Sequence, residues 1–165
     1  MTDNVANYRE DIINAIVPYA REDQRVNLLV CDMGFGVTDA FKDEFPDRIF
    51  NMGIMEQGSV GIAAGMALSG LVPVVYSIVN FLVFRALEQI RNDVVKQNLN
   101  VKFIATGVNN YFEFLGDSHC CGEDDKKIME LIRMPVFDPY ETPEKRFDEL
   151  VHQWITSPKA GYIRV

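Results

Sequence analysis

Short apolar runs rich in β-branched residues alternate along the chain with amphipathic stretches. A first helix is predicted from about Asn7 to Arg21, because Ile12, Ile13 and Ile16 fall on one of its faces. Regular alternation of strand-like and helix-like segments is typical of an α/β domain with a mostly parallel sheet. The predicted fold is therefore a three-layer α/β/α domain with about six strands.

Periodicity, together with glycine and proline positions, predicts the other elements. The predicted strands are Asn27–Cys31, Arg48–Asn51, Val72–Tyr76, Val101–Thr106, Val136–Phe137 and Gly161–Val165. The remaining predicted helices are Thr38–Phe45, Glu56–Leu68, Phe81–Gln97, Glu123–Leu131 and Thr142–Thr156. The segment Gly107–Gly122 shows no periodicity and is predicted to be a loop. No repeat, linker or low-complexity tract interrupts the pattern, so residues 1–165 are expected to form a single domain.

The composition narrows the class of protein. Hydrophobic residues make up 48% of the chain, which is enough for a proper core. The net charge of −8, without a basic block, argues against a nucleic-acid surface. No apolar window is long enough to span a membrane, and the N-terminus has no signal-like stretch. The odd number of cysteines does not make a disulfide framework, so a cytoplasmic protein with reduced thiols is expected.

The helix that begins at Glu56 has an unusual composition. Gly58, Gly61 and Gly65 lie inside it, although each glycine costs about 1 kcal/mol relative to alanine. These residues leave a surface with few side chains, to which another backbone can come close. A carboxylate at the head of such a helix, in an apolar setting, is suited to an unusual protonation state. The alternative is that Glu56 only complements the helix dipole and that the small residues are ordinary packing.

Several polar segments follow predicted strands. In open α/β sheets, functional groups gather beyond the carboxyl ends of the strands. Asp32, Gly53–Glu56, Ser77–Phe81 and Gly107–Gly122 all lie at such positions. These segments are therefore the candidates for a functional site.

A long ordered pattern connects these segments to a known family. It comprises Arg48–Gln57, the small-residue helix, Phe81–Val94, Gln97–Lys102 and the closing Gly161–Arg164. Together these segments strongly resemble the pyrimidine-binding domain of transketolases, over roughly the whole chain. The resemblance implies that Glu56 hydrogen-bonds a ring nitrogen of the aminopyrimidine of thiamine diphosphate and promotes removal of the thiazolium proton. Such chemistry requires Glu56 to be buried.

The resemblance also suggests how a flat heterocycle is held. Ile78, Phe81 and Phe84 would line the pyrimidine pocket, where aromatic faces allow stacking. The family often has an aromatic residue at the position of Ile78. Without the resemblance, plain core packing is the expected role of Phe81 and Phe84. Asp32 matches an acidic loop near the cofactor, although an Asx turn or a helix cap before Thr38 explains it equally well.

The substrate side of the site is predicted from one loop and one helix. The stretch Gly116–His119 resembles a Gly-Pro-Thr-His loop whose histidine faces the substrate, which gives Ser118 and His119 a substrate role. Asp117 stands in place of the proline, and Cys120 in place of a histidine or glutamine, which favours a non-standard sugar or acceptor. Arg85 could reach a substrate or a partner chain, or form a solvated or interface salt bridge.

The motifs for metal and diphosphate binding that the sequence lacks predict a partner subunit. No zinc site is expected from His119, Cys120 and Cys121, because adjacent cysteines have the wrong spacing for one tetrahedral ion. The sequence contains neither Gly-Asp-Gly nor a Walker-type phosphate loop. In the family, a second domain with Gly-Asp-Gly holds the diphosphate and its Mg²⁺. We therefore expect a separate diphosphate-binding subunit, in an α2β2 heterotetramer with cofactors at the interfaces.

The leading hypothesis is the small subunit of a split transketolase-like enzyme that transfers a two-carbon ketol or acyl unit between sugars or aldehydes. A subunit of a two-chain 2-oxoacid decarboxylase is the alternative enzyme, since it shares the glutamate but not the Phe81–Asp93 pattern. A non-catalytic module that binds a partner is a different class of function. A nucleotide-binding doubly wound domain fits less well, because no glycine loop for phosphate follows the first strand.

Overall fold

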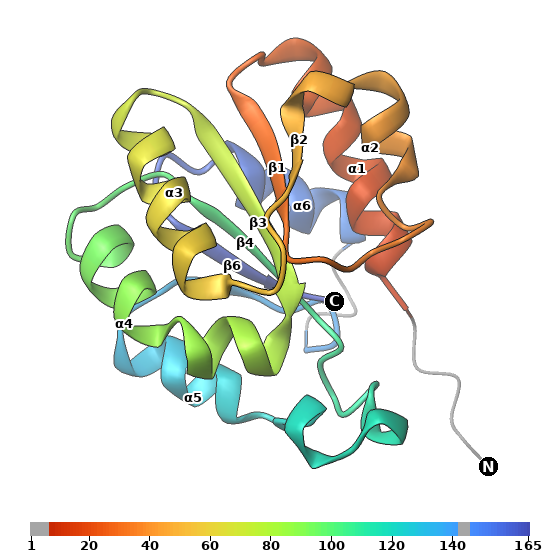
Figure 1. Cartoon of the computed structure of the whole chain (residues 1–165), viewed down its shortest axis with the longest axis vertical. Helices are drawn as coiled ribbons and strands as arrows, with labels where there is room; N and C mark the ends of the chain where they lie inside the picture. Colours follow the sequence, from red (N-terminus) through yellow and green to blue (C-terminus); the bar gives the residue numbers. More distant parts are fainter. Residues whose placement is uncertain (1–6, 142–145) are drawn as a thin grey trace.

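The computed structural model describes residues 7–141 and 146–165. Six strands form one sheet in the order β2-β1-β3-β4-β6-β5, and all neighbouring strands are parallel. Helices α1, α2 and α6 cover one face of this sheet, while α3, α4 and α5 cover the other (Figure 1). The predicted three-layer α/β/α fold with six strands is confirmed.

The elements follow the predicted order. The strands are β1 Val26–Val30, β2 Ile49–Asn51, β3 Val72–Ile78, β4 Lys102–Thr106, β5 Val136–Phe137 and β6 Gly161–Arg164. The helices are α1 Arg9–Glu22, α2 Asp39–Glu44, α3 Glu56–Leu68, α4 Leu87–Gln89, α5 Asp124–Leu131 and α6 Phe147–Thr156. Most predicted boundaries lie within two residues of these. The predicted start of the last helix, at Thr142, lies outside the described residues.

The strands are apolar on both faces because each face is covered by helices. Side chains alternate between two buried clusters, as the two-residue period of a strand requires. In β4, for example, Phe103 and Ala105 pack into one cluster, whereas Ile104 between them packs into the other. The first cluster lies under α3 and α5, and the second lies under α1 and α6. This double burial fixes the register of the central strands.

The predicted long helix Phe81–Gln97 is not one regular helix. It consists of two π-helical segments, Phe81–Arg85 and Ile90–Val95, on either side of the short α4. The interruption lies at Ala86, whose backbone angles of −107° and 15° depart from helical values. Such π-helical turns are often found at functional sites. The prediction of a continuous helix was wrong, and the distortion affects the segment that contains Phe81, Phe84 and Arg85.

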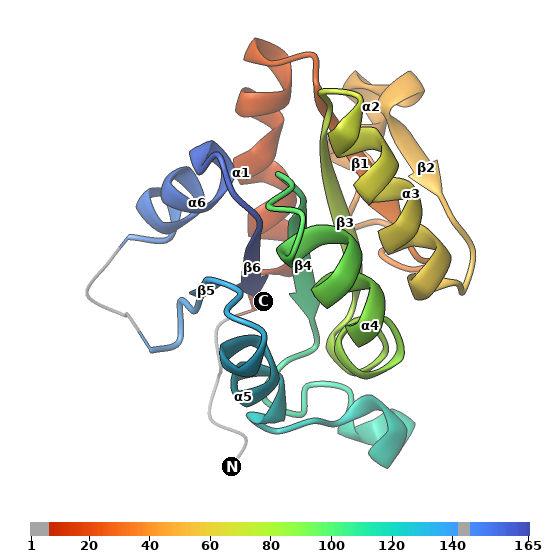
Figure 2. The same cartoon turned by 90° about the vertical axis from the view of Figure 1, so that its left-hand side faces the viewer.

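The segment Gly107–Gly122 is largely irregular, as predicted, with short 3₁₀ turns at Glu113–Leu115 and Asp117–His119. It lies beyond the carboxyl ends of the strands (teal in Figure 2). Among the described residues, no helix is long and apolar enough to cross a membrane.

The topological switch point of the sheet lies between β1 and β3, and we call the region beyond the carboxyl ends of these two strands the crevice. From β1 the chain passes through α2 to β2 on one side, and then through α3 to β3 on the other side. The direction of strand addition therefore reverses at β1, and open α/β sheets bind ligands beyond the carboxyl ends of the strands at such a point. Asp32 follows β1, Glu56 begins α3, and Ser77 lies near the end of β3.

Candidate functional site

Glu56 is the buried centre of this crevice. It is the first residue of α3, and only 1% of it is exposed. The Ser77 hydroxyl donates to its Oε1 at 3.2 Å, and Nη1 of Arg85 donates to its Oε2 at 2.5 Å. Burial of a carboxylate is costly unless its oxygens receive hydrogen bonds, and these two donors supply them. The predicted burial of Glu56 is confirmed, whereas its two partners were not predicted.

The guanidinium of Arg85 lies between Glu56 and the face of Phe81. Its Cζ is 4.4 Å from the centroid of the Phe81 ring, which is a cation–π distance. The Arg85 side chain is 37% exposed, so it covers Glu56 from the solvent side. The predicted alternatives for Arg85 were a substrate or partner contact and a solvated or interface salt bridge. The structure shows a salt bridge, which was one of these alternatives, and its partner is the buried Glu56 within the candidate site.

His119 lies beside the same aromatic ring. The ring centroids of Phe81 and His119 are 4.9 Å apart in an edge-to-face arrangement. The Ser118 hydroxyl is 3.1 Å from Nδ1 of His119, and the Asn80 amide donates to the Ser118 carbonyl oxygen at 2.6 Å. The structure therefore brings Ser118 and His119 to the edge of the crevice. Asn80, which fixes this loop against the end of β3, lies in the predicted candidate segment Ser77–Phe81, although no role was predicted for it.

A small polar layer lies beneath Glu56. The thiol of Cys31, directly after β1, is 3.4 Å from the hydroxyl of Ser59, which in turn donates to the carbonyl of Met55. Burial raises the pKa of the Cys31 thiol, and the negative charge of Glu56 adds to this effect. Cys31 is therefore a neutral, buried residue at neutral pH, and it supports the crevice without providing a nucleophile.

Asp32 lies at the rim of the crevice, in the left-handed region with a φ of 50°. Its carboxylate accepts from the Asn51 amide at 3.0 Å, and its backbone N–H donates to Asn51 Oδ1 at 3.2 Å. The N–H of Gly53 donates to the same Asn51 oxygen. Asn51 thus connects the loop after β1 to the turn that precedes Glu56. Neither an Asx turn of Asp32 nor a cap before Thr38 is needed to explain this geometry.

The other two predicted pocket residues differ in their surroundings. Ile78 is the last residue of β3 and is partly buried, but the two-residue period of the strand places its side chain on the face of Val74 and Tyr76, opposite that of Ser77. Phe84 is 50% exposed, so its ring lies at the surface and not in the core. An exposed phenylalanine next to the crevice is not explained by plain core packing.

The segment that contains His119 is anchored by a buried group of charges, which we call the Arg164 cluster: Arg164, Asp125, Asp138 and Tyr162. Arg164 donates to Asp125 and Asp138, and the Tyr162 hydroxyl donates to Asp125 at 2.8 Å. Burial opposes the charge of Arg164, but the two carboxylates raise its pKa. Its Nη2 also lies 3.4 Å from Asn109 Oδ1 and from the Gly122 carbonyl, at the two ends of the segment.

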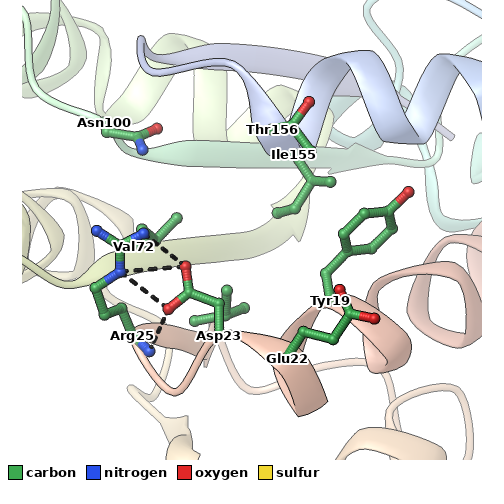
Figure 3. A pocket seen from close by; sticks show the side chains of 9 residues that line it. Tyr19, Glu22, Asp23, Arg25, Val72, Asn100, Ile155 and Thr156 are labelled. Atoms are coloured by element: carbon green, nitrogen blue, oxygen red, sulfur yellow. Dashed lines mark hydrogen bonds and ion pairs between the residues drawn. The ribbon is translucent and has the colours of Figure 1, made fainter.

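Other parts of the described chain have fewer groups suited to binding or catalysis. Among residues 7–141 and 146–165, no group of three His, Cys, Asp or Glu side chains is arranged to hold a metal ion. A pocket of about 290 Å³ lies beyond the amino ends of β1 and β3, where Arg25 pairs with Asp23 beside Glu22 (Figure 3). None of the predicted site residues lines it. The crevice at Glu56 is therefore the candidate functional site.

The crevice is suited to a flat group that donates hydrogen bonds. Arg85 shows this directly, because its planar guanidinium stacks on Phe81 and donates to Glu56. An aminopyrimidine is also planar and has ring and amino nitrogens in its plane. A buried carboxylate and an aromatic face are the groups that such a ring requires, and Glu56 and Phe81 supply them. The residues present therefore fit the pyrimidine of thiamine diphosphate.

Comparison with known families agrees with this geometry. The family model for the transketolase pyrimidine binding domain matches residues 5–159. The chain belongs to this family. The predicted resemblance is thus confirmed, and the matched residues include the Glu56 site and the small-residue helix but end before β6.

Named relatives of this transketolase-family chain include whole enzymes and subunits. It is 44% identical over 159 residues to a 1-deoxy-D-xylulose-5-phosphate synthase of Syntrophus aciditrophicus, covering 96% of this chain and 24% of that protein. It is 38% identical over 125 residues to an apulose-4-phosphate transketolase subunit of Actinobacillus succinogenes. That match covers 76% of this chain and 40% of the subunit. A solved structure described as a split gene transketolase, inactive beta4 tetramer, matches with a TM-score of 0.78 and 33% identity. That match covers 94% of this chain and 49% of the other, so the chain spans less than half of each protein.

Proposed function

We propose that this chain is the pyrimidine-binding subunit of a two-subunit, thiamine diphosphate-dependent transketolase-like enzyme. The enzyme would transfer a two-carbon ketol or acyl unit between sugar or aldehyde substrates. The observation that carries the proposal is the buried Glu56 carboxylate beside the face of Phe81, at the switch point of a sheet of this family. A glutamate in that position serves no evident packing purpose.

Glu56 has the central role in the proposed mechanism. When bound, thiamine diphosphate supplies an electron sink for carbon–carbon bond chemistry. Glu56 would hold a proton at Oε2 against a ring nitrogen of the pyrimidine, while the Ser77 hydroxyl keeps the other oxygen fixed at 3.2 Å. Because Glu56 is 1% exposed, water does not compete for that proton.

Aromatic and apolar residues would orient the ring. Phe81 offers its face, and Ile78 at the end of β3 and the exposed Phe84 would add apolar contacts to the ring. Asp32, held by Asn51 at the rim, would contact the cofactor from the β1 side. These residues bind and orient without taking part in bond formation.

His119 is proposed to contact the substrate and to transfer a proton. Its Nδ1 faces the Ser118 hydroxyl at 3.1 Å, which leaves Nε2 to exchange a proton with a substrate oxygen. Ser118 orients the imidazole, and its own carbonyl is held by Asn80. Arg85 becomes available to an anionic substrate group only when it leaves Glu56.

The diphosphate and its Mg²⁺ would be held mainly by a separate subunit. Subunit names among the relatives and the split gene transketolase structure support this arrangement. The beta4 tetramer in that structure is described as inactive, which suits the view that such subunits need a partner. An α2β2 heterotetramer would place two pyrimidine-binding subunits against two diphosphate-binding subunits.

The test is to purify the protein from its native extract, identify copurifying chains by mass spectrometry, and assay thiamine diphosphate in the eluate. A partner that contains Gly-Asp-Gly, with cofactor present, is the expected result. The complex should then consume a ketose phosphate with an aldehyde acceptor. Release of carbon dioxide from a 2-oxoacid would instead indicate a decarboxylase, and a solitary chain without cofactor would contradict the proposal.

A further inference from the structure

In this structure the proposed pyrimidine site is already filled by the chain's own side chain. The Arg85 guanidinium lies 4.4 Å from the Phe81 centroid and donates to Glu56 Oε2 at 2.5 Å. Both features of the site, the aromatic face and the carboxylate oxygen, are therefore engaged at once. The remaining Glu56 oxygen accepts from Ser77, so each carboxylate oxygen already has a protein donor.

The guanidinium and the aminopyrimidine share the chemistry that this site recognises. Both are flat, both stack on an aromatic ring, and both present nitrogens in their plane to a carboxylate. The two groups cannot lie on the same face of Phe81 and against the same Glu56 oxygen together. We infer that Arg85 is an internal competitor of the aminopyrimidine, which holds the cofactor site closed until ligand and partner displace it. This inference rests on the proposed function.

The position of Arg85 allows such a displacement. Its side chain is 37% exposed, whereas Glu56 is almost fully buried, so the arginine enters the site from solvent and leaves into solvent. Arg85 is also the last residue of a π-helical segment, directly before the irregular Ala86. The segment therefore has a backbone break at the point from which this side chain extends.

Competition of this kind has a physical rationale in a subunit that waits for a partner. A buried carboxylate without a donor destabilises a protein, and Arg85 supplies the donor while the cofactor is absent. A ligand must then replace the ion pair. Its apparent association constant is therefore the intrinsic constant multiplied by the fraction of molecules in which the site is open. The free chain should bind the pyrimidine weakly, and removal of Arg85 should strengthen that binding.

The competition can be measured in the free chain with the pyrimidine fragment of the cofactor, 4-amino-5-hydroxymethyl-2-methylpyrimidine, by isothermal titration calorimetry. Arg85→Met and Arg85→Gln should each bind the fragment about tenfold more tightly than the wild type, because neither carries a guanidinium. Arg91→Met is the matched control, since Arg91 lies on the next π-helical segment and bonds only the neighbouring Asn92 among the described contacts. It should bind like the wild type.

A second readout does not depend on the cofactor. Methylguanidinium at millimolar concentration should raise the melting temperature of Arg85→Met by refilling the site, but not that of the wild type. The double variant Arg85→Met with Glu56→Gln should show neither the gain in fragment affinity nor the stabilisation, because the carboxylate is absent.

The outcomes separate the two ideas. Equal fragment binding by wild type and both Arg85 variants, abolished by Glu56→Gln, would overturn the competition and leave the proposed function standing. Binding by no variant, with no response to methylguanidinium, would overturn both. Stabilisation by methylguanidinium without fragment binding would support Arg85 as the occupant of the site and contradict the assignment of the site to a pyrimidine.

Discussion

A buried carboxylate needs a donor for each oxygen, and Glu56 has one from Ser77 and one from Arg85. The two donors differ in kind. Ser77 is itself buried and fixed on β3, so its hydroxyl remains in place whatever binds. Arg85 is partly exposed and can leave. One oxygen is therefore permanently oriented, and the other is available to a ligand.

Ser77→Ala is expected to lower the activity of the assembled enzyme by about tenfold, because the Glu56 carboxylate loses the donor that orients it. The measurement is kcat/KM with a saturating concentration of cofactor. Ser69→Ala is the control, since the Ser69 hydroxyl donates only to the Gly65 carbonyl at the far end of α3. Equal activity of the Ser77 variant and the wild type would show that Glu56 does not depend on this bond.

The sequence allowed Glu56, Phe81 and His119 to be predicted, because each lies directly beyond a strand or in a segment of the family pattern. It did not reveal the partners of Glu56. Ser77 is 21 residues away and Arg85 is 29 residues away, so no helical or strand period connects them. Their meeting depends on the packing of α3 against β3 and against the segment Phe81–Arg85, which only the folded chain provides.

Helix α3 has a glycine-containing face that is exposed to solvent in the described part of the chain. Gly61 and Gly65 are exposed, and a Cβ built at either position would meet no atom within 4 Å. Ile62 and Leu68 on the same helix are also exposed. Such a face is suited to close packing against another chain, which agrees with the proposed partner subunit.

Gly61→Ala and Gly65→Ala should each stabilise the free chain by about 1 kcal/mol, because alanine favours the helix and nothing obstructs its methyl group. Gly61→Leu and Gly65→Leu should fold equally well but weaken assembly with the partner by roughly tenfold to a hundredfold. Urea unfolding and analytical ultracentrifugation measure the two effects. Lys127→Leu on α5 is the control for a leucine added to the surface away from α3. Undisturbed assembly of the leucine variants would place the interface elsewhere.

The distortion between Phe81 and Val95 could not be predicted from the pattern of the sequence. Leu82, Val83, Ala86, Ile90 and Val94 are all buried at spacings that fit a regular helix. A π-helical turn differs only by the hydrogen bonds of its backbone, and these leave no trace in composition. The strands were easier to predict, because burial on both faces gives them continuous apolar runs.

At the scale of the whole molecule, two cations among the described residues are buried, Arg164 and Lys102. Arg164 is paired with Asp125 and Asp138, so its charge is compensated. Lys102 in β4 is buried too, and its ammonium group donates to the carbonyls of Ser157 and Lys159 at 2.7 and 2.6 Å. Burial lowers the pKa of Lys102 to about 7. The sequence showed neither residue to be buried, because lysine and arginine are almost never fully buried unless they are paired.

The Lys102 pKa predicts how stability depends on pH. The unfolded chain keeps this lysine protonated up to its ordinary pKa, whereas the folded chain releases the proton above about pH 7. The unfolded state therefore binds more protons between pH 7 and 9, and stability rises with pH there, by at most about 1.4 kcal/mol per pH unit.

Lys102→Met should abolish this contribution, so the difference in unfolding free energy between wild type and variant should change over that range. Urea unfolding at pH 7, 8 and 9 measures it, and all other titrating groups cancel in the difference. A difference that stays constant from pH 7 to 9 would mean that Lys102 remains charged in the folded chain, solvated by its two carbonyls.

The central claim is that Glu56 promotes loss of the thiazolium proton of thiamine diphosphate in the assembled enzyme. The most direct measurement is the rate of hydrogen–deuterium exchange at that carbon, followed by quenched-flow NMR, for the wild type and Glu56→Gln. The variant should still assemble with its partner and bind the cofactor, but exchange at least about a hundredfold more slowly. An unchanged exchange rate in a complex that retains its cofactor would contradict the account.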